Sequence, residues 1–313
     1  MKYHPSNLIA KARKYASYLH NLLLRMERLE ESVGKLHVAS QRSLTSDNIQ
    51  DYEFRVFSQT GEDGIIQHLI QRVQPAHEIF VEFGVQTYVE SCTRFLLMNN
   101  NWRGLVADGS AAAIDYIRKD RIYWMHDLTA VQAFITRDNI NEIIAGNGIQ
   151  GEIGLLVIDI DGNDYWVWEA ITCIDPTIVV CEFNSLFGPH AEVSIPYKPD
   201  FVRTQAHYSN LYFGASIAAL THLAAQKGYI LVGANRHGQN LFFVKADRAA
   251  GLRALTPAEA YVQSKFREAR DPEGRLTYAR FEEALATIGD MPLTNVITGD
   301  SLRVRDIAPT VRV

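Results

Sequence analysis

The chain has 313 residues, of which 47% are hydrophobic and 21% charged, and its formal net charge is −5. This composition is ordinary for a globular protein, and the charge offers no basic surface of the kind that binds nucleic acid. No apolar run reaches the roughly 18 residues of a membrane span, and no signal-peptide pattern opens the chain. Cys92, Cys173 and Cys181 favour free thiols in a reducing compartment over a disulfide framework. We therefore expect a cytoplasmic protein.

Residues 8–36 are predicted to form one helix, because they contain no proline and are rich in Lys, Arg, Glu, Leu and Met. Its apolar residues alternate at spacings of three and four, a heptad seam made of Leu19, Leu22, Met26, Leu29, Val33 and Leu36. So short a seam would be marginal as an isolated coiled coil. Two interpretations stay open: the helix docks on its own domain, or it joins subunits of a homo-oligomer. The polar stretch 40–50 is predicted to be a linker, so residues 1–50 form an N-terminal helical segment.

A polar stretch, VFSQTGEDG over 56–64, precedes a helix predicted over 65–73. Its residues, Ser58 and Gln59 among them, suit an N-cap and turn, and they equally suit the lining of a ligand pocket.

Strand 79–83 carries Glu82 and runs into a turn at Gly84, and a helix is expected over 90–98. Strand, glycine turn and helix are the first half of a nucleotide-binding unit, in which the backbone approaches the ligand closely.

The next predicted strand, 104–108, ends at Asp108. An acid at the end of the second strand is where dinucleotide folds bind ribose hydroxyls. Alternatively, Asp108 caps the helix that starts near residue 111. A third strand is predicted over 122–125, leading to Asp127.

Two apolar runs that each end in acid form the centre of the chain. Such Val/Ile/Leu runs, predicted as strands 155–159 and 177–182, suit a parallel sheet that is covered on both faces. A short helix joins them, so both strands end at the same edge, outside which ligands of open α/β sheets bind. We expect one rim to gather Asp159, Asp161, Asp164, Glu182 and Asn184.

The remainder completes an α/β fold. The segment 185–213 is long and irregular, holds three prolines and six aromatic residues, and is expected to be functional, as a lid is. After a helix, strands 229–233 and 241–245 are predicted to form an antiparallel hairpin. Seven strands, mostly parallel and ending in a hairpin, are the layout of the Rossmann-like class I S-adenosylmethionine (SAM) methyltransferases. We assign 51–250 to this domain and 251–313 to a C-terminal helical or irregular appendage that packs on the core.

Several stretches resemble a family of bacterial methyltransferase-like proteins: FSQTGEDGI, FVEFGV, NNWRGLVADGS, IDIDGNDYWVWEAI, VVCEFNSLFGP and FGAS…KGYILVG. That family is related to the FkbM-type sugar and polyketide O-methyltransferases and often occurs with polysaccharide biosynthesis. The resemblance covers residues 50–300. It implies a SAM-dependent O-methyltransferase that acts on a sugar hydroxyl of a surface glycan or its precursor, with the cofactor against Glu82, Gly84 and Asp108. The chain departs from the family at Gln86 and Thr87, where a second glycine and an acid are usual.

The resemblance and the strand ends together give the cofactor-binding candidates: Ser58, Gln59, Glu82, Gly84, Asp108, Gly109, Ser110, Asp127 and Asp159. Methylation of an alcohol requires loss of the hydroxyl proton, which a metal or a base assists. Oxygen ligands at adjacent strand ends suit Mg²⁺ or another divalent cation, and the candidate ligands are Asp159, Asp161, Glu182 and Asn184.

Without a metal, clustered acids raise one another's pKa, so that one of them could act as the base. Asp161 and His190 are the catalytic candidates. Two alternatives remain. Residues 161–163 could simply form a turn, with Asp164 capping the next helix. The Gln86 departure also allows a binding or scaffold protein that has the fold without transfer activity.

Overall fold

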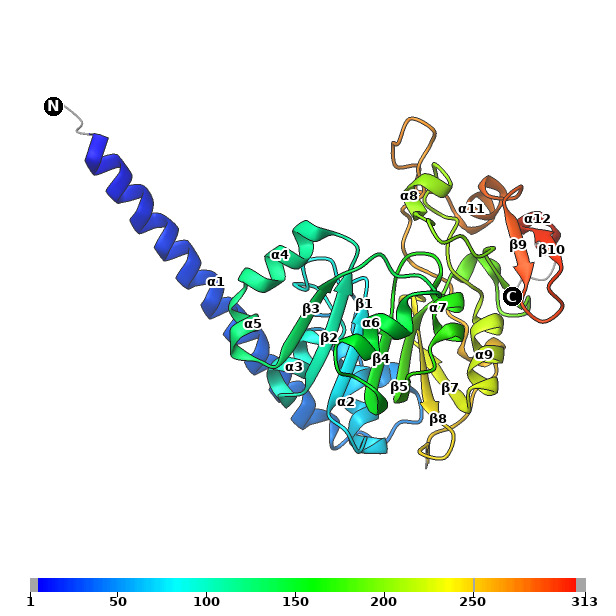
Figure 1. The fold of residues 1–313 in the computed structure, drawn as a ribbon, viewed down its shortest axis with the longest axis horizontal. Helices are drawn as coiled ribbons and strands as arrows, with labels where there is room; N and C mark the ends of the chain where they lie inside the picture. The colour runs from blue at the N-terminus through cyan, green and yellow to red at the C-terminus, as the bar shows by residue number, and fades with distance from the viewer. Residues whose placement is uncertain (1–4, 250, 308–313) are drawn as a thin grey trace.

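A seven-stranded sheet forms the centre of the computed structural model, which describes residues 5–249 and 251–307. The strand order is β3-β2-β1-β4-β5-β8-β7, and β8 runs antiparallel to both of its neighbours, β5 and β7. The strands are β1 (Ile79–Phe83), β2 (Arg103–Asp108), β3 (Leu128–Gln132), β4 (Gly151–Ile158), β5 (Ile174–Glu182), β7 (Tyr229–Ala234) and β8 (Asn240–Lys245). This is the class I methyltransferase fold, as the sequence predicts (Figure 1).

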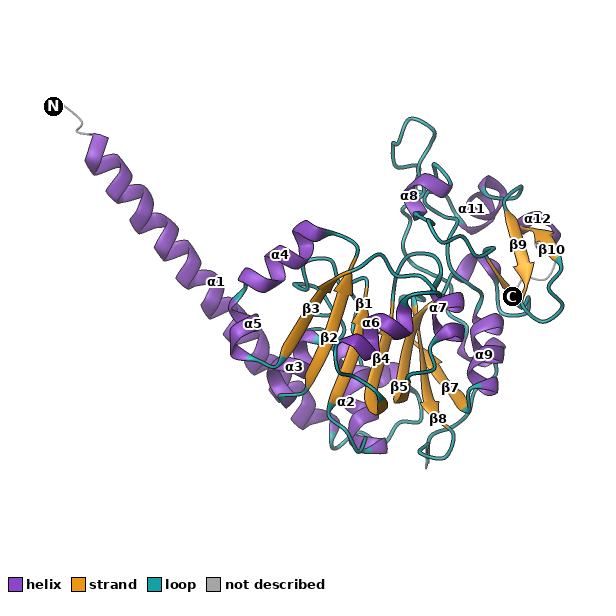
Figure 2. Cartoon of the chain, viewed as in Figure 1, coloured by secondary structure: helices purple, strands orange, loops and turns teal. Residues whose placement is uncertain are grey.

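Helices cover both faces of the sheet, because successive strand residues point to opposite sides. Phe80 belongs to an apolar cluster with α2 (Glu62–Val73), α3 (Arg94–Asn100) and α4 (Ala111–Lys119). Its neighbour Val81 belongs to the cluster on the other face. That face is covered by α6 (Ile140–Gly146), α7 (Asp164–Ala170) and α9 (Ile217–Gln226) (Figure 2).

The predicted strand over 122–125 is wrong. These residues form a helical turn, α5 (Arg121–Met125), because the Asp120 side chain accepts a hydrogen bond from the Ile122 N–H (3.0 Å) and caps it. The edge strand is β3 instead, which pairs with β2 from Leu128 to Gln132. Asp127 therefore precedes β3, at the amino edge of the sheet, and not at the edge where a cofactor would bind.

The N-terminal helix, α1 (Pro5–Gln41), is confirmed and is longer than predicted. Its C-terminal half lies along the body and its N-terminal half projects away from it (Figure 1). Gln41, expected to lie in a linker, is buried and donates to the Gly64 carbonyl (3.0 Å). A 3-10 turn, η1 (Ile49–Tyr52), leads into the sheet domain.

A small second sheet lies beside the carboxyl edge of the first. Its order is β10-β9-β6, from β6 (Val193–Ser194), β9 (Pro292–Asn295) and β10 (Ser301–Arg303). One apolar cluster joins residues of the segment 185–213, such as Phe187, to residues of the C-terminal part, such as Ile288. The same region contains η2 (Ser185–Phe187), α8 (Arg203–Ala206), α11 (Phe281–Thr287) and α12 (Val304–Ile307), whereas α10 (Pro257–Ala260) packs against β7 and α9 of the main domain. In the described ranges, no helix is both long and apolar enough to cross a bilayer.

Candidate functional site at the carboxyl edge of the sheet

A cavity of about 1230 Å³ opens where β1, β4 and β5 end. Its sheet side includes Glu82 after β1, Asp159 after β4, and Glu182 in the last position of β5. Its opposite side comes from residues 263–269 and 279–284 of the C-terminal part. The volume exceeds the roughly 300–1,000 Å³ of common ligand pockets, so it leaves room for a cofactor and an acceptor together.

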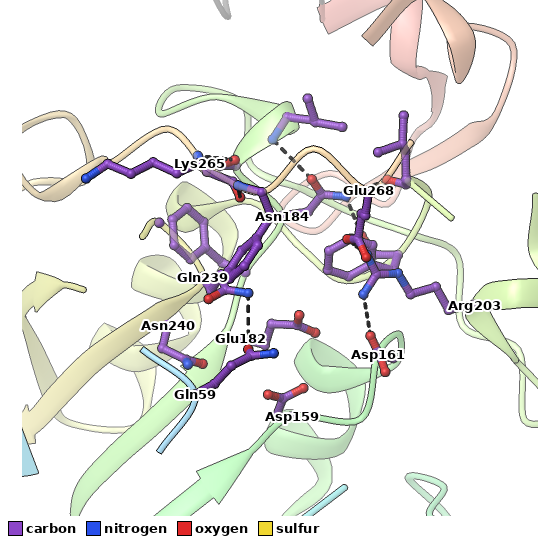
Figure 3. Close-up of a pocket in the computed structure, with 18 of the residues that line it drawn as sticks. Gln59, Asp159, Asp161, Glu182, Asn184, Arg203, Gln239, Asn240, Lys265 and Glu268 are labelled. Atoms are coloured by element: carbon purple, nitrogen blue, oxygen red, sulfur yellow. Dashed lines mark hydrogen bonds and ion pairs between the residues drawn. The ribbon is translucent and has the colours of Figure 1, made fainter. Parts of the chain in front are cut away.

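The predicted acidic rim exists. Asp159, Asp161 and Glu182 each offer a carboxylate oxygen within 4.8 Å of the others, and Figure 3 shows all three turned toward one space. The register explains this, because Ile158 pairs with Cys181 and the residues that follow them are neighbours. Three acids and their spacing suit a divalent cation.

Glu182 is the most enclosed of these acids, at 7% exposure. Its Oε2 atom is buried without a hydrogen-bond partner in the described part of the chain. Burial raises the pKa of Glu182 well above its ordinary value, and the charges of Asp159 and Asp161 raise it further. Burial likewise raises the pKa of Asp159, with added repulsion from Asp161. The arrangement therefore favours a bound proton or cation.

A positively charged side chain, Arg203 on α8, also lies at the rim. Its guanidinium forms ion pairs with Asp161 and with Glu268 (Figure 3). Its Cζ atom lies 3.8 Å from the Phe213 ring centroid. Its Nε donates to the Asn210 carbonyl (2.8 Å), which fixes the orientation of the guanidinium. Sequence reasoning missed Arg203. The available signal was that it is the one arginine of the segment 185–213.

The turn over 161–163 is confirmed, but Asp164 does not cap the next helix: it is the first residue of α7, whose N-cap is Asn163. The two oxygens of Asp164 instead accept from the N–H groups of Ile160 and Gly162 (2.9 Å each), in the turn that precedes α7. Burial raises its pKa to about 6. Asp161 has a positive φ of 55°, uncommon for a residue with a side chain, and its carboxylate faces Arg203. Asp164 thus shapes the turn and Asp161 remains available to the cavity.

Asn184 lies at the rim as predicted, but its amide is already engaged. The Nδ2 atom donates to the carbonyls of Leu211 (2.9 Å) and Phe213 (3.0 Å), and Oδ1 accepts from the Leu186 N–H (3.0 Å). The side chain therefore ties the segment 185–213 to the end of β5.

The turn after β1 is held by internal contacts. Gly84 has φ 77°, and a Cβ there would lie 1.6 Å from the Asp159 carbonyl oxygen, so glycine is required by the neighbouring strand. Glu82 is buried and accepts from the Ser91 hydroxyl (2.6 Å) and the Cys92 N–H (2.9 Å). Its pKa is raised by burial, partly offset by these donors. Glu82 thus fixes the loop from 84 to 93.

Asp108 closes β2, with Gly109 and Ser110 behind it. Its Oδ2 accepts from the Gln86 N–H and its Oδ1 from the Ser110 N–H (2.7 Å each). Gln86 adopts a positive φ of 46° to make this contact. Each carboxylate oxygen keeps a further lone pair, so Asp108 is oriented and can still accept from a hydroxyl. The Ser110 hydroxyl caps α4.

The structure brings only some of the candidates to the cavity. The cofactor-binding candidates that line it are Gln59, Glu82, Gly84 and Asp159. Those not among its lining residues are Ser58, Asp108, Gly109, Ser110 and Asp127. Ser58 instead donates through its hydroxyl to Asp63 (2.9 Å). His190 is exposed and does not line the cavity.

No family model and no curated protein matches this sequence. Among solved structures, the chain is similar to an O-methyltransferase from Bacillus cereus in complex with SAH, at 13% identity and TM-score 0.38, covering 69% of this chain and 90% of that one. It is also similar to the CurJ carbon methyltransferase, at 11% identity and TM-score 0.39, covering 79% of this chain and 72% of that one. A third similar structure is the N-terminal domain of EvdMO1 with SAH bound, at 8% identity and TM-score 0.39, covering 60% of this chain and 82% of that one.

Proposed function

We propose that this chain is a SAM-dependent O-methyltransferase that acts on a sugar hydroxyl of a surface glycan or its nucleotide-linked or lipid-linked precursor. The observation that carries the proposal is the place of the acids. In this fold, a cavity large enough for two ligands opens at the carboxyl edge, with Asp159, Asp161 and Glu182 gathered inside it. A cytoplasmic location stays a prediction; it accords with Cys92, Cys173 and Cys181, which are all free thiols.

The rim supplies what O-methylation needs. When bound, SAM would supply a methyl group on a positively charged sulfur, which would pass to the acceptor oxygen as the carbon–sulfur bond breaks, and the chain's own residues would have to take up the hydroxyl proton. Glu182, when ionised, suits the role of proton acceptor, because it lines the cavity and its Oε2 has no partner among described residues. Asp161 is the second candidate.

The same acids fit a divalent cation such as Mg²⁺. Asp159, Asp161 and Glu182 would hold it, and it would lower the pKa of a hydroxyl bound to it. Arg203 would have to release Asp161 in exchange. Asn184 is a weaker ligand candidate, because its Oδ1 already caps η2.

A cofactor fits over β1 and β4, where Gln59, Gly84 and Asp159 line the cavity. Asp108 does not line the cavity itself, so we infer that the ribose reaches past Gln86, which does, and that its hydroxyls donate to the lone pairs of Asp108 that Gln86 and Ser110 leave free. The Gln86 turn also favours the second candidate function, a scaffold with the fold but no transfer, because it occupies the start of the loop that would border the cofactor.

Calorimetry with SAM and SAH on the full chain tests the cofactor. We expect both to bind, and Asp108→Ala to weaken binding roughly tenfold, since a charge-assisted hydrogen bond contributes about 1.5–3 kcal/mol. If neither molecule binds the unmutated chain, the proposal fails. Transfer of labelled methyl from SAM to a polysaccharide-precursor extract then tests the reaction. Glu182→Gln should lose transfer and keep SAH binding, whereas binding without transfer by the unmutated chain would support the scaffold function.

A further inference from the structure

Helix α1 contacts its own body through one face only. The residues of that face recur at spacings of three and four and are partly or fully buried: Leu24, Glu27, Glu31, Gly34, Val38 and Gln41. Glu27 pairs with Arg94 (2.9 Å) and Arg121, and a Cβ on Gly34 would lie 2.6 Å from the Val56 side chain. We call these six residues the docked face.

The heptad seam lies on another face of α1, and no part of the described chain covers it. Its residues stay exposed: Leu19 58%, Leu22 42%, Met26 51%, Leu29 64%, Val33 43% and Leu36 70%. At about 100° per residue, the centres of the seam and of the docked face lie roughly 150° apart around the helix. Docking on the body therefore does not use the seam, and Tyr15 (68% exposed) extends the seam toward the free end.

We propose that the seam pairs with the same seam of a second copy of this chain, as a parallel, in-register, two-stranded coiled coil. Exposed apolar residues at heptad spacing are the pattern that buries itself in such a pair. One row of the seam holds Leu19, Met26 and Val33, and the other holds Leu22, Leu29 and Leu36. Leucine throughout the second row, with a β-branched residue in the first, favours two strands, and Val33 is the one β-branched residue of that first row.

Charge selects the orientation. Arg25 and Glu30 flank the seam on opposite sides, are exposed, and have no ion pair within the described chain. In a parallel in-register pair, Arg25 of each copy faces Glu30 of the other, which gives two attractive contacts. In an antiparallel pair, the side of the seam that carries Arg25 faces the same side in the other copy, and likewise for Glu30. Arg25 and Glu30 therefore do not face each other in that orientation.

The body does not obstruct this pairing. Because the docked face is nearly opposite the seam, each sheet domain would lie on the outside of the helix pair. The N-terminal half of α1 projects beyond its own sheet domain (Figure 1). A parallel pair places both bodies at one end of a short rod. This inference is independent of the proposed catalytic function.

Light scattering of the full chain tests the pairing. We expect twice the 35.3 kDa mass of one chain, falling to a single mass in Leu22→Glu/Leu29→Glu. The matched control is Asn21→Glu/Arg28→Glu, which adds two acids one residue earlier on the exposed helix surface and should stay dimeric. A monomer at all concentrations overturns the proposal and leaves the seam to a different protein or to lipid. A dimer that survives the seam substitutions overturns it as well.

Two further variants test the orientation. Arg25→Glu should weaken the dimer several-fold, and Arg25→Glu/Glu30→Arg should restore it, because the swap recreates both contacts. Oxidised Leu29→Cys should give a covalent dimer, with the unmutated chain as the control for its native thiols. Failure of the swap to restore affinity, together with no covalent dimer, rejects the parallel register.

Discussion

At the residue scale, the turn after β1 depends on one missing side chain. Gly84→Ala would place a Cβ 1.6 Å from the Asp159 carbonyl oxygen and at φ 77°. We expect the free energy of unfolding to fall by roughly 2–4 kcal/mol, from backbone strain and the shift of β4 that the contact forces. Denaturant unfolding measures this. The control is Gly146→Ala at the end of α6, where a Cβ meets nothing within 4 Å and stability should change little.

Arg203 and a divalent cation compete for Asp161. Removing the guanidinium leaves Asp159, Asp161 and Glu182 without the counter-charge of Arg203. Arg203→Gln should therefore bind Mn²⁺ more tightly, by about fivefold if the partly exposed ion pair with Asp161 contributes about 1 kcal/mol. Calorimetry measures the affinity. Lys198→Gln, in an exposed pair with Asp200, should change nothing. Absence of any Mn²⁺ binding in both the unmutated chain and Arg203→Gln would exclude the metal and leave the acids as candidate bases.

The sequence predicts the place of the acids better than their partners. Parallel strands joined by one crossover must end at one edge, so the meeting of Asp159 and Glu182 follows from the topology. The ion pair from Arg203 joins residues far apart in sequence, and no local pattern encodes it. The sequence also places Asn184 at the rim, but whether its amide faces a ligand or caps a turn is decided by the segment that packs above it, here Leu211 and Phe213.

At the element scale, most strands follow from the hydrophobic pattern and one does not. Residues 122–125 are apolar enough for a strand, yet the cap from Asp120 makes them helical and β3 starts at Leu128. The alternation in β3 is short and half exposed, as edge strands are, so its signal was weaker than that of the preceding apolar residues. In the small sheet, β6 pairs with β9 across about a hundred residues of sequence, which periodicity cannot show.

Helix α2 is predicted to lose stability in acid through His68. Its ring stacks on Tyr52 with 3.5 Å between centroids, and burial lowers its pKa from 6.5 to about 4, with Arg72 adding repulsion. Neutral His68 fits the fold, so this contribution is complete above the unfolded pKa of 6.5 and is lost as the pH falls through about 4. The stability of His68→Phe should fall less between pH 6.5 and 4, as urea unfolding would show. His77→Gln, at a mostly exposed histidine, should keep the pH dependence of the unmutated chain.

At the scale of the whole molecule, two regions that are distant in sequence enclose the cavity. The sheet supplies the acids, and the part of the chain after residue 251 supplies the opposite wall. That wall rests on an apolar cluster with the segment 185–213, so the segment expected to act as a lid is one half of a larger cover. Access for an acceptor therefore depends on how firmly this cover is fastened to the sheet.

One fastening is the chain of charges from Asp161 through Arg203 to Glu268. It links the end of β4 to the cover, and the Arg203 side chain is 14% exposed while that of Glu268 is 49% exposed. Glu268→Gln should release residues 263–284 without unfolding the apolar cluster. We expect amide hydrogen exchange there to rise up to about fivefold, since such a partly exposed pair contributes at most about 1 kcal/mol. Exchange in β4 should stay unchanged.

Arg253→Gln is the control. It breaks an exposed pair with Glu259 that lines no part of the cavity, and it should leave 263–284 as protected as before. Equal exchange in Glu268→Gln and the unmutated chain would mean that the apolar cluster alone holds the cover, and that the acceptor enters by another route than release of this ion pair.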